Sequence, residues 1–552
     1  MKKFVKNYYY ILLPICISVF MMLLCNLYFA TVDDLYMEEI ANSNANGREN
    51  LVCLSALYGY LFKALYSLAP NVNWFTVCYV AVLNIAMMTM YKIVKDNDSP
   101  IYGVGILAAI QAYLMIRMTF TALSFISCVS AVMWIMHKVT KLTKKSVLYF
   151  VEAFLLFCMG FAMRGGSVFT CIMLLFVPFY LFAILEHRNK ITVVVTLMLV
   201  CIVSHLLIGR INESMKASIP EETYFNQFHK YRSAVSDQGY VDYDNHAEML
   251  NKVGISQNDV FLYAKTMYAD KSVFSMEALE VMKDAKDIND KYTLDILYLS
   301  KNMVKMAFIW WYLAAMLISL ILMQKNYKEI IAVSVFVMGA IFYLFLRRRG
   351  VARVVNQISI AGIIMLLSIA MRELKGKYSF KDLKKCKLMA VGLVCIFGLN
   401  IAVAWAYDII TARPMLRNAA PVLDYINENN ENVYVCNAAT RSSFINRELT
   451  FSRKAVEHKP IYNINGNWYV YTDYWYFTLE QLGLQQYEDS TFNALLEPNV
   501  KYIASESDER FMDYIVKFLD EHYNIDAYYK VEKEFDNSSL RVYSFEENNN
   551  MS

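Results

Sequence analysis

The sequence predicts an α-helical polytopic membrane protein with a separate α/β domain at its C-terminal end. First, 57% of the 552 residues are hydrophobic and only 19% are charged, far more apolar surface than a water-soluble core needs. Second, the apolar residues come in blocks of roughly 17 to 22, the length of helix that crosses a bilayer. Third, these blocks stop before residue 414, after which 22 acidic residues oppose 12 basic ones. This distribution does not fit a nucleic-acid-binding protein.

About eleven of the blocks are predicted to be transmembrane helices. The first follows three lysines and is longer than the apolar part of a signal peptide, so we expect it to be retained. The predicted spans are residues 8–30, 74–90, 101–116, 121–136, 147–163, 168–185, 191–209, 303–323, 330–346, 354–371 and 388–406.

The lysines predict the orientation of these spans. With the N-terminus in the cytoplasm, the lysines of the short connections all fall on the cytoplasmic side, as the positive-inside rule requires. Counting the apolar block 51–69 as a further span would move Lys92 and all later lysine loops outside. We therefore expect 51–69 to be a helix on the outer surface of the membrane. The C-terminal domain then lies outside the plasma membrane. The Asn-, Lys- and Tyr-rich composition suggests that the source is a bacterium.

These spans divide the chain into a transmembrane domain at residues 1–409 and an extracytoplasmic α/β domain at 410–552. Large outer loops are expected at 31–73 and 210–302. Short patterns predict helices at 245–253, 275–286 and 508–520 and a strand at 433–436.

A pair of carboxylates, Asp33 and Asp34, follows the first span. At the outer mouth of a helix bundle, such a pair could supply the base that a sugar-transfer reaction needs, because the acceptor proton must leave as the new bond forms. The second carboxylate could orient the base or bind a metal. An ordinary acidic turn or helix start explains the same residues.

The short outer connections contain arginines and no lysine. The planar guanidinium of arginine binds phosphate through two hydrogen bonds, and a lipid phosphate is the expected anion at the outer leaflet. Ordinary phospholipid headgroups would attract the same side chains. These arginines are Arg117, Arg164, Arg347, Arg348, Arg349 and Arg353.

The second outer loop holds a polar and aromatic run that could line a sugar site, with Tyr231, Arg232 and Asp237 as candidate contacts. Packing inside a helical cap would account for the same residues. His205 lies in a predicted span without a second histidine nearby, so an acyltransferase built on it is disfavoured.

The layout resembles the GT-C superfamily of integral-membrane glycosyltransferases, and more narrowly the uncharacterised multi-pass GT-C-like proteins of Gram-positive bacteria. The resemblance rests on Asp33 and Asp34 after the first helix, the surface helix, the large loop after the seventh span and the terminal domain. It implies a polyprenyl-phosphate sugar donor, a cell-envelope acceptor and an inverting reaction. It further implies that Asp33 or Asp34 is the base and that arginines such as Arg349 and Arg353 hold the donor phosphate.

The resemblance leaves open whether a divalent cation, Mg²⁺ or Mn²⁺, takes part, and the sequence shows no metal-ligand spacing. A flippase of lipid-linked glycans is an alternative, although few charges and few prolines fall within the spans. A non-catalytic scaffold that displays the C-terminal domain is a third possibility.

Overall fold

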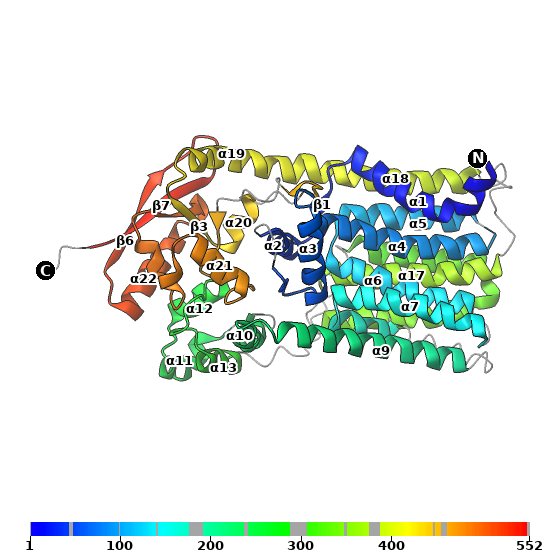
Figure 1. Cartoon of the computed structure of the whole chain (residues 1–552), viewed down its shortest axis with the longest axis horizontal. Coiled ribbons are helices and arrows are strands. Elements are labelled where there is room, and N and C mark those ends of the chain that lie inside the picture. Colours follow the sequence, from blue (N-terminus) through cyan, green and yellow to red (C-terminus); the bar gives the residue numbers. More distant parts are fainter. Residues whose placement is uncertain are drawn as a thin grey trace. The chain divides into compact units, whose positions relative to one another are not determined.

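The computed structural model describes the chain except for residues 1, 44–47, 99, 140–141, 176–190, 237–240, 287–305, 347–349, 375–386, 445–447, 454–460 and 549–552. The chain forms two compact units (Figure 1). Unit 1 comprises Met1–Ser214, Tyr292–Ala406 and Arg447–Arg453. Unit 2 comprises Met215–Lys291, Tyr407–Asn446 and Lys454–Ser552. The second outer loop and most of the tail therefore belong to the same unit.

Unit 1 is built from long apolar helices, and the prediction of a polytopic helical membrane protein is confirmed. Among the described residues, eight helices are long and apolar enough to cross a membrane. The shorter apolar helices Ile101–Ile116, Gly166–Leu175 and Ala307–Leu322 overlap the predicted spans 101–116, 168–185 and 303–323, of which residues 176–185 and 303–305 lie outside the described residues. The helices of this unit that carry the predicted spans include α1 (Lys2–Leu24), α4 (Trp74–Asp96), α5 (Ile101–Ile116), α6 (Phe120–Lys138), α7 (Lys144–Met163), α9 (Ile191–Lys216), α15 (Ala307–Leu322), α16 (Tyr327–Leu346), α17 (Ala352–Glu373) and α18 (Lys387–Tyr407).

Helix α6 is the most buried of the long helices, and small residues let its neighbours approach closely. The hydroxyl of Ser124 donates to the carbonyl of Gly160 on α7 at 2.7 Å, and Ser130 donates to Ala86 on α4 at 3.1 Å. A side chain at Gly160 would meet the sulfur of Cys128 at 2.7 Å. Small residues and hydroxyl groups are the usual contacts between helices in a membrane, where lipid removes most of the hydrophobic drive to associate.

The first outer loop of unit 1 is partly regular. It contains β1 (Tyr28–Phe29), α2 (Val32–Asn42) and α3 (Ala56–Leu68). The predicted first span, 8–30, is too long, because α1 ends at Leu24 and β1 pairs in parallel with β2 (Arg117–Met118), which requires an extended backbone. The predicted helix within 51–69 is present as α3, although it begins only after its N-cap residue Ser55.

Unit 2 contains a five-stranded sheet of order β4-β3-β5-β7-β6. Strand β3 pairs in parallel with β4 and β5, whereas β7 is antiparallel to β5 and β6. The strands are β3 (Val433–Cys436), β4 (Ile461–Tyr462), β5 (Val500–Ser505), β6 (Ala527–Lys533) and β7 (Leu540–Glu547), and the helices of this unit include α10 (Glu222–Ser236), α11 (Tyr243–Lys252), α12 (Gln257–Ala264), α13 (Met276–Asp284), α19 (Arg413–Glu428), α20 (Ala438–Phe444), α21 (Asp473–Gln481) and α22 (Arg510–Tyr523).

The predicted elements of unit 2 are confirmed: β3 matches the predicted strand, and α11, α13 and α22 match the predicted helices within a few residues. Helix α19 carries Pro414 in its first turn and Pro421 within it. Its Ala419, Val422 and Ile426, spaced three and four residues apart, are buried in the same core cluster as β3, β5 and β7.

Candidate active site

The predicted carboxylates Asp33 and Asp34 lie in the first turn of α2, after the N-cap residue Thr31. Carboxylates are favoured at this position because the helix dipole places partial positive charge there. The reading of these residues as an acidic helix start therefore describes their local structure correctly. Whether they also form a reactive site depends on what surrounds each side chain.

Asp34 is completely buried and fixed by hydrogen bonds. One carboxylate oxygen accepts hydrogen bonds from the Tyr79 hydroxyl at 3.0 Å and the Phe120 backbone N–H at 2.8 Å, and the other accepts from the Thr31 hydroxyl at 2.5 Å. Burial raises the pKa of Asp34 to about 6, although hydrogen bonds from Thr31, Phe120, Thr119 and Tyr79 oppose the shift. The side chain ties α2 to α4 and to the start of α6, and it is not accessible to a substrate.

Asp33 differs from Asp34 in being accessible. Its side chain is 26% exposed, and its Oδ2 lies 2.5 Å from Nη1 of Arg353, whose side chain is 27% exposed. Arg353 lies in the first turn of α17, so two segments that are 320 residues apart in sequence meet in this ion pair. The pair is the part of the predicted site that a substrate could reach.

Arg164 lies close to this pair. It follows α7, and its guanidinium group lies over the ring of Phe120 at 4.9 Å from the ring centre. Burial and the neighbouring charge of Arg353 lower the pKa of Arg164, and these effects outweigh the opposing charges of Asp33 and Asp34. The structure therefore brings together four of the predicted residues, two carboxylates and two arginines.

Arg117 lies at the edge of the same region. It follows α5 as the first residue of β2, where it pairs with Tyr28 just before α2. It interacts electrostatically with Tyr113, whose hydroxyl accepts a 2.8 Å hydrogen bond from Asn356, one turn after Arg353 on α17. Arg117 is thus connected through side chains to the helix that carries Arg353.

The other predicted site residues lie elsewhere. Tyr231 and Arg232 belong to α10 in unit 2, where Arg232 donates to Ser236 at 3.2 Å and lies over the ring of Tyr268. Asp237 and Arg349, like Arg347 and Arg348, lie outside the described residues.

Sequence reasoning missed a polar network around Glu38, a buried residue of α2. Its carboxylate accepts hydrogen bonds from the Asn73 side-chain amide at 2.6 Å and from the Thr76 hydroxyl at 3.2 Å. Asn73 also caps α4 by accepting from the backbone N–H of Thr76 at 3.3 Å. The Asn73-to-Thr76 spacing before an apolar run could have revealed the cap, but no local pattern points to Glu38 as its partner.

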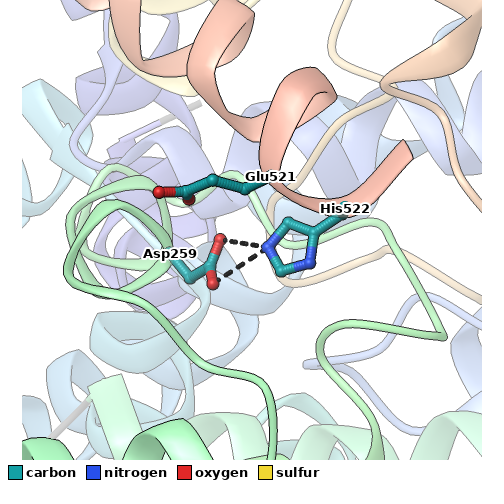
Figure 2. A group of neighbouring side chains, drawn as sticks. All are labelled: Asp259, Glu521 and His522. Carbon is teal, nitrogen blue, oxygen red and sulfur yellow. Dashed lines mark hydrogen bonds and ion pairs between the residues drawn. The ribbon is translucent and has the colours of Figure 1, made fainter. Parts of the chain in front are cut away.

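One group of histidine and carboxylate side chains among the described residues could hold a metal ion. Asp259, Glu521 and His522 place their ligand atoms within 4.8 Å of one another. Figure 2 shows Asp259 of α12 facing His522 of α22, with Nε2 of His522 2.9 and 3.0 Å from its two carboxylate oxygens. Glu521 accepts a 2.8 Å hydrogen bond from Ser256 and pairs with Lys517. These contacts join α12 to α22 within unit 2.

Among solved structures, the chain is similar to two of ArnT from Cupriavidus metallidurans. The crystal structure of ArnT bound to undecaprenyl phosphate is 12% identical in sequence, with a TM-score of 0.38 over 97% of this chain and 97% of that chain. For the apo state of ArnT the identity is 11% and the TM-score 0.36, over 99% of this chain and 98% of that chain. No protein-family model and no curated protein matches the chain.

Proposed function

We propose that this chain is an integral-membrane glycosyltransferase of the GT-C type. It transfers a hexose or pentose from a polyprenyl-phosphate donor to a glycan, lipid or protein acceptor of the cell envelope. In this proposal the N-terminus lies in the cytoplasm of a bacterium, and the reaction takes place at the outer face of the plasma membrane. The lysine distribution supports this orientation.

The observation that carries the proposal is the partly exposed ion pair of Asp33 and Arg353 beside Arg164. A carboxylate that a substrate can reach is able to accept a proton. Arginine side chains at the end of a helix bundle are suited to bind a lipid phosphate. Because Asp34 is buried and both of its oxygens accept hydrogen bonds, we assign the base to Asp33 and a positioning role to Asp34.

In the proposed reaction Asp33 takes the proton of the acceptor hydroxyl while the hydroxyl oxygen forms a bond to the anomeric carbon. The bond between that carbon and the donor phosphate oxygen breaks, and the polyprenyl phosphate leaves with the electron pair. Arg164 and Arg353 neutralise the phosphate, so their stabilisation grows as negative charge develops on the leaving group. Attack from the side opposite the phosphate inverts the anomeric centre.

Asp33 and Asp34 do not fit a shared site for a divalent cation. The oxygens of Asp34 accept hydrogen bonds from three protein donors, and Asp33 contacts Arg353. Neither belongs to the group of described side chains that could hold a metal ion. We propose that the two arginines supply the positive charge, and we assign no step to Mg²⁺ or Mn²⁺. Turnover that is unchanged by EDTA would agree with this assignment, and turnover restored only by an added divalent ion would contradict it.

The remaining predicted contacts, Arg117, Tyr231 and Arg232, are proposed to bind the donor phosphate or the transferred sugar. Asp237 and Arg349 have the same proposed role from the sequence alone. Alanine variants of each should raise the KM for one substrate more than they lower kcat, because such contacts bind the ground state and the transition state alike.

The deciding experiment compares purified wild-type protein with three variants, Asp33→Asn, Asp34→Asn and Asp244→Asn. Asp244 is the matched control because it is an exposed acid in the first turn of another helix, α11. Each protein is incubated with radiolabelled polyprenyl-phosphate sugars and a membrane extract that supplies acceptors. Loss of the base should lower turnover about 10²- to 10⁴-fold in Asp33→Asn, while Asp34→Asn retains measurable turnover and Asp244→Asn matches wild type.

The other outcomes separate the competing functions. If Asp34→Asn loses turnover and Asp33→Asn does not, the base is Asp34. If wild type binds the donor but never consumes it, the chain is better explained as a flippase of lipid-linked glycans. Absence of both binding and turnover with every donor would favour a non-catalytic scaffold.

A further inference from the structure

A short segment of the tail, residues 448–453, packs against the first outer loop and is named the strap here. The chain on either side of it belongs to unit 2, whereas the strap itself belongs to unit 1. It bridges to Tyr28 through Glu448 and to Val72 through Ser452. Its backbone hydrogen bonds run from Leu449 N–H to the Leu27 carbonyl at 2.8 Å, from Asn73 N–H to the Phe451 carbonyl at 2.9 Å and from Arg453 N–H to the Asn71 carbonyl at 3.1 Å.

The side chain of Arg453 extends these contacts to the end of α2. It is 2% exposed, and its Nη2 donates to the backbone carbonyl of Asn42, the last residue of α2, at 2.9 Å. Its Nη1 donates to the carbonyl of Pro70 at 3.3 Å, and the guanidinium lies 4.7 Å from the ring centre of Tyr66 on α3. Arg453 therefore joins the C-terminal end of α2 to α3 and to the turn before α4.

A second connection reaches the middle of α2 through Asn73. The side-chain amide of Asn73 donates to the carbonyl of Thr450 in the strap at 2.8 Å and to the buried carboxylate of Glu38 at 2.6 Å. The strap thus contacts the chain just before α2, at Leu27 and Tyr28, and the last residue of α2. It is linked to the middle of α2 through Asn73.

Helix α2 has 11 residues, and a helix of this length is marginal in isolation, so its position depends on tertiary contacts. Asp34 anchors its first turn, the hydroxyls of Thr76 and Tyr66 donate to Glu38 and Asn42, and the strap adds the bond of Arg453 at its end. We propose that the strap positions α2 for catalysis, and that Arg453 is the positioning residue that holds Asp33 and Asp34 in register with Arg353. This inference rests on the proposed glycosyltransferase function.

The test compares Arg453→Met, Arg453→Lys and the control Ser452→Ala in the full-length protein. Ser452 lies in the strap with an exposed side chain, and its backbone makes the bridge to Val72. Two quantities are measured: the kinetics with a polyprenyl-phosphate sugar, and the hydrogen exchange of peptides that cover α2, α6 and α22.

Arg453→Met should lower kcat about 10- to 100-fold, because small misplacement of a reacting group costs that much. The donor KM should stay near the wild-type value, since Arg164 and Arg353 remain in place. Hydrogen exchange in Arg453→Met should accelerate in α2 and stay at the wild-type rate in α6 and α22. Arg453→Lys should recover part of kcat, because lysine can bond one carbonyl but cannot span two, and Ser452→Ala should match wild type.

Unchanged α2 exchange in Arg453→Met would overturn the proposal, as would an acceleration that is equal in all three helices, which would indicate general destabilisation. If wild type shows no turnover with any donor, the glycosyltransferase proposal fails while the exchange data still decide whether the strap holds α2. If wild type turns over and α2 exchange rises without loss of kcat, the positioning role fails alone.

Discussion

Asp34 in unit 1 and Asp259 in unit 2 begin from the same local pattern and end in different roles. Each is completely buried, and each is the third residue after a hydroxyl residue at a helix N-cap, Thr31 for α2 and Ser256 for α12. Asp259 completes a capping box, accepting from Ser256 N–H at 2.8 Å while its own N–H donates to the Ser256 hydroxyl oxygen at 3.2 Å. Asp34 forms no capping box: its carboxylate accepts from the Thr31 hydroxyl and, beyond its own helix, from Tyr79 and the Phe120 N–H. A local motif therefore fixes a helix start, and its tertiary partners decide its chemistry.

The partners also decide which group changes its pKa. The donors to Asp34 are neutral, so burial dominates and raises the pKa of Asp34 to about 6. Asp259 faces a histidine: burial lowers the pKa of His522, but the hydrogen bond and charge of Asp259, with Asp270 and Glu521, outweigh it and raise that pKa above 6.5. Both groups bind a proton more tightly in the folded chain than in the unfolded chain. Each should therefore contribute stability that is lost as pH rises, but in different pH ranges.

The largest expected effect is the pH dependence due to Asp34. Its contribution is complete below its ordinary pKa of 3.8 and is lost as pH rises through about 6; the shift corresponds to roughly 3 kcal/mol. Asp34→Asn mimics the protonated acid, because its oxygen can accept from Tyr79 and Phe120. Thermal melting in detergent should show that the stability of this variant no longer declines as pH rises, and that the variant is more stable than wild type at neutral pH. If the stability of wild type and of Asp34→Asn depended on pH in the same way, Asp34 would not be a buried carboxylate surrounded only by uncharged donors.

The next effect concerns the accessible half of the unit 1 site. Arg353→Met should lower kcat/KM about 10- to 100-fold, because a charge-assisted contact is worth roughly 1.5 to 3 kcal/mol, and Arg353→Lys should recover only part of it. Arg372→Met is the matched control, since Arg372 lies at the other end of α17 and also pairs with a carboxylate, Glu329. Equal losses in Arg353→Met and Arg372→Met would mean that α17 is only destabilised.

A smaller effect is expected for His522→Gln in unit 2. The histidine side chain is 16% exposed and Asp259 is buried, but the glutamine amide can still donate to Asp259, so the loss should be about 1 kcal/mol. Because the pKa of His522 is raised, its contribution is complete below pH 6.5 and is lost as pH rises through the raised value. Hydrogen exchange of α12 and α22 should accelerate in the variant at pH 6 and differ less from wild type at high pH. A difference that grows with pH would contradict this assignment.

The smallest effect separates the two caps. Ser256→Ala should destabilise α12 by about 0.5 to 1 kcal/mol, because both hydrogen bonds of the Ser256 hydroxyl are lost. Thr31→Ala removes no cap bond from α2, but it removes the 2.5 Å hydrogen bond to Asp34 and should raise the pKa of Asp34 further. Local hydrogen exchange measures the first, and a shift of the pH-dependent melting curve measures the second. If hydrogen exchange at the start of α2 in Thr31→Ala accelerated as much as that of α12 in Ser256→Ala, the two caps would be equivalent.

Much of the architecture followed from the sequence. The apolar blocks predicted the long helices of unit 1, and the short patterns predicted β3, α11, α13 and α22. Both signals are local, since a helix that crosses lipid must form its backbone hydrogen bonds internally and expose apolar side chains along its own length. The boundary of the first span was wrong because Tyr28 and Phe29 pair with residues of β2, a contact that composition does not encode.

The candidate site was predictable in part. The candidate carboxylates and arginines were chosen because they fall in segments predicted to lie on the outer side of the membrane. Asp33, Asp34, Arg164 and Arg353 do lie near one another. Their neighbours in the fold were not predictable, because Tyr79 and the Phe120 N–H reach Asp34 from other helices.

By itself, the sequence determined that this chain is a bundle of apolar helices with an α/β tail, because hydrophobic length and periodicity act along the chain. The tertiary structure alone decided that Asp33 is accessible while Asp34 is buried. It also decided that the second outer loop and most of the tail form one unit, and that six residues of the tail pack against the first outer loop. These outcomes depend on contacts between segments far apart in sequence, whose free energies come from burial and hydrogen-bond geometry that no local pattern contains.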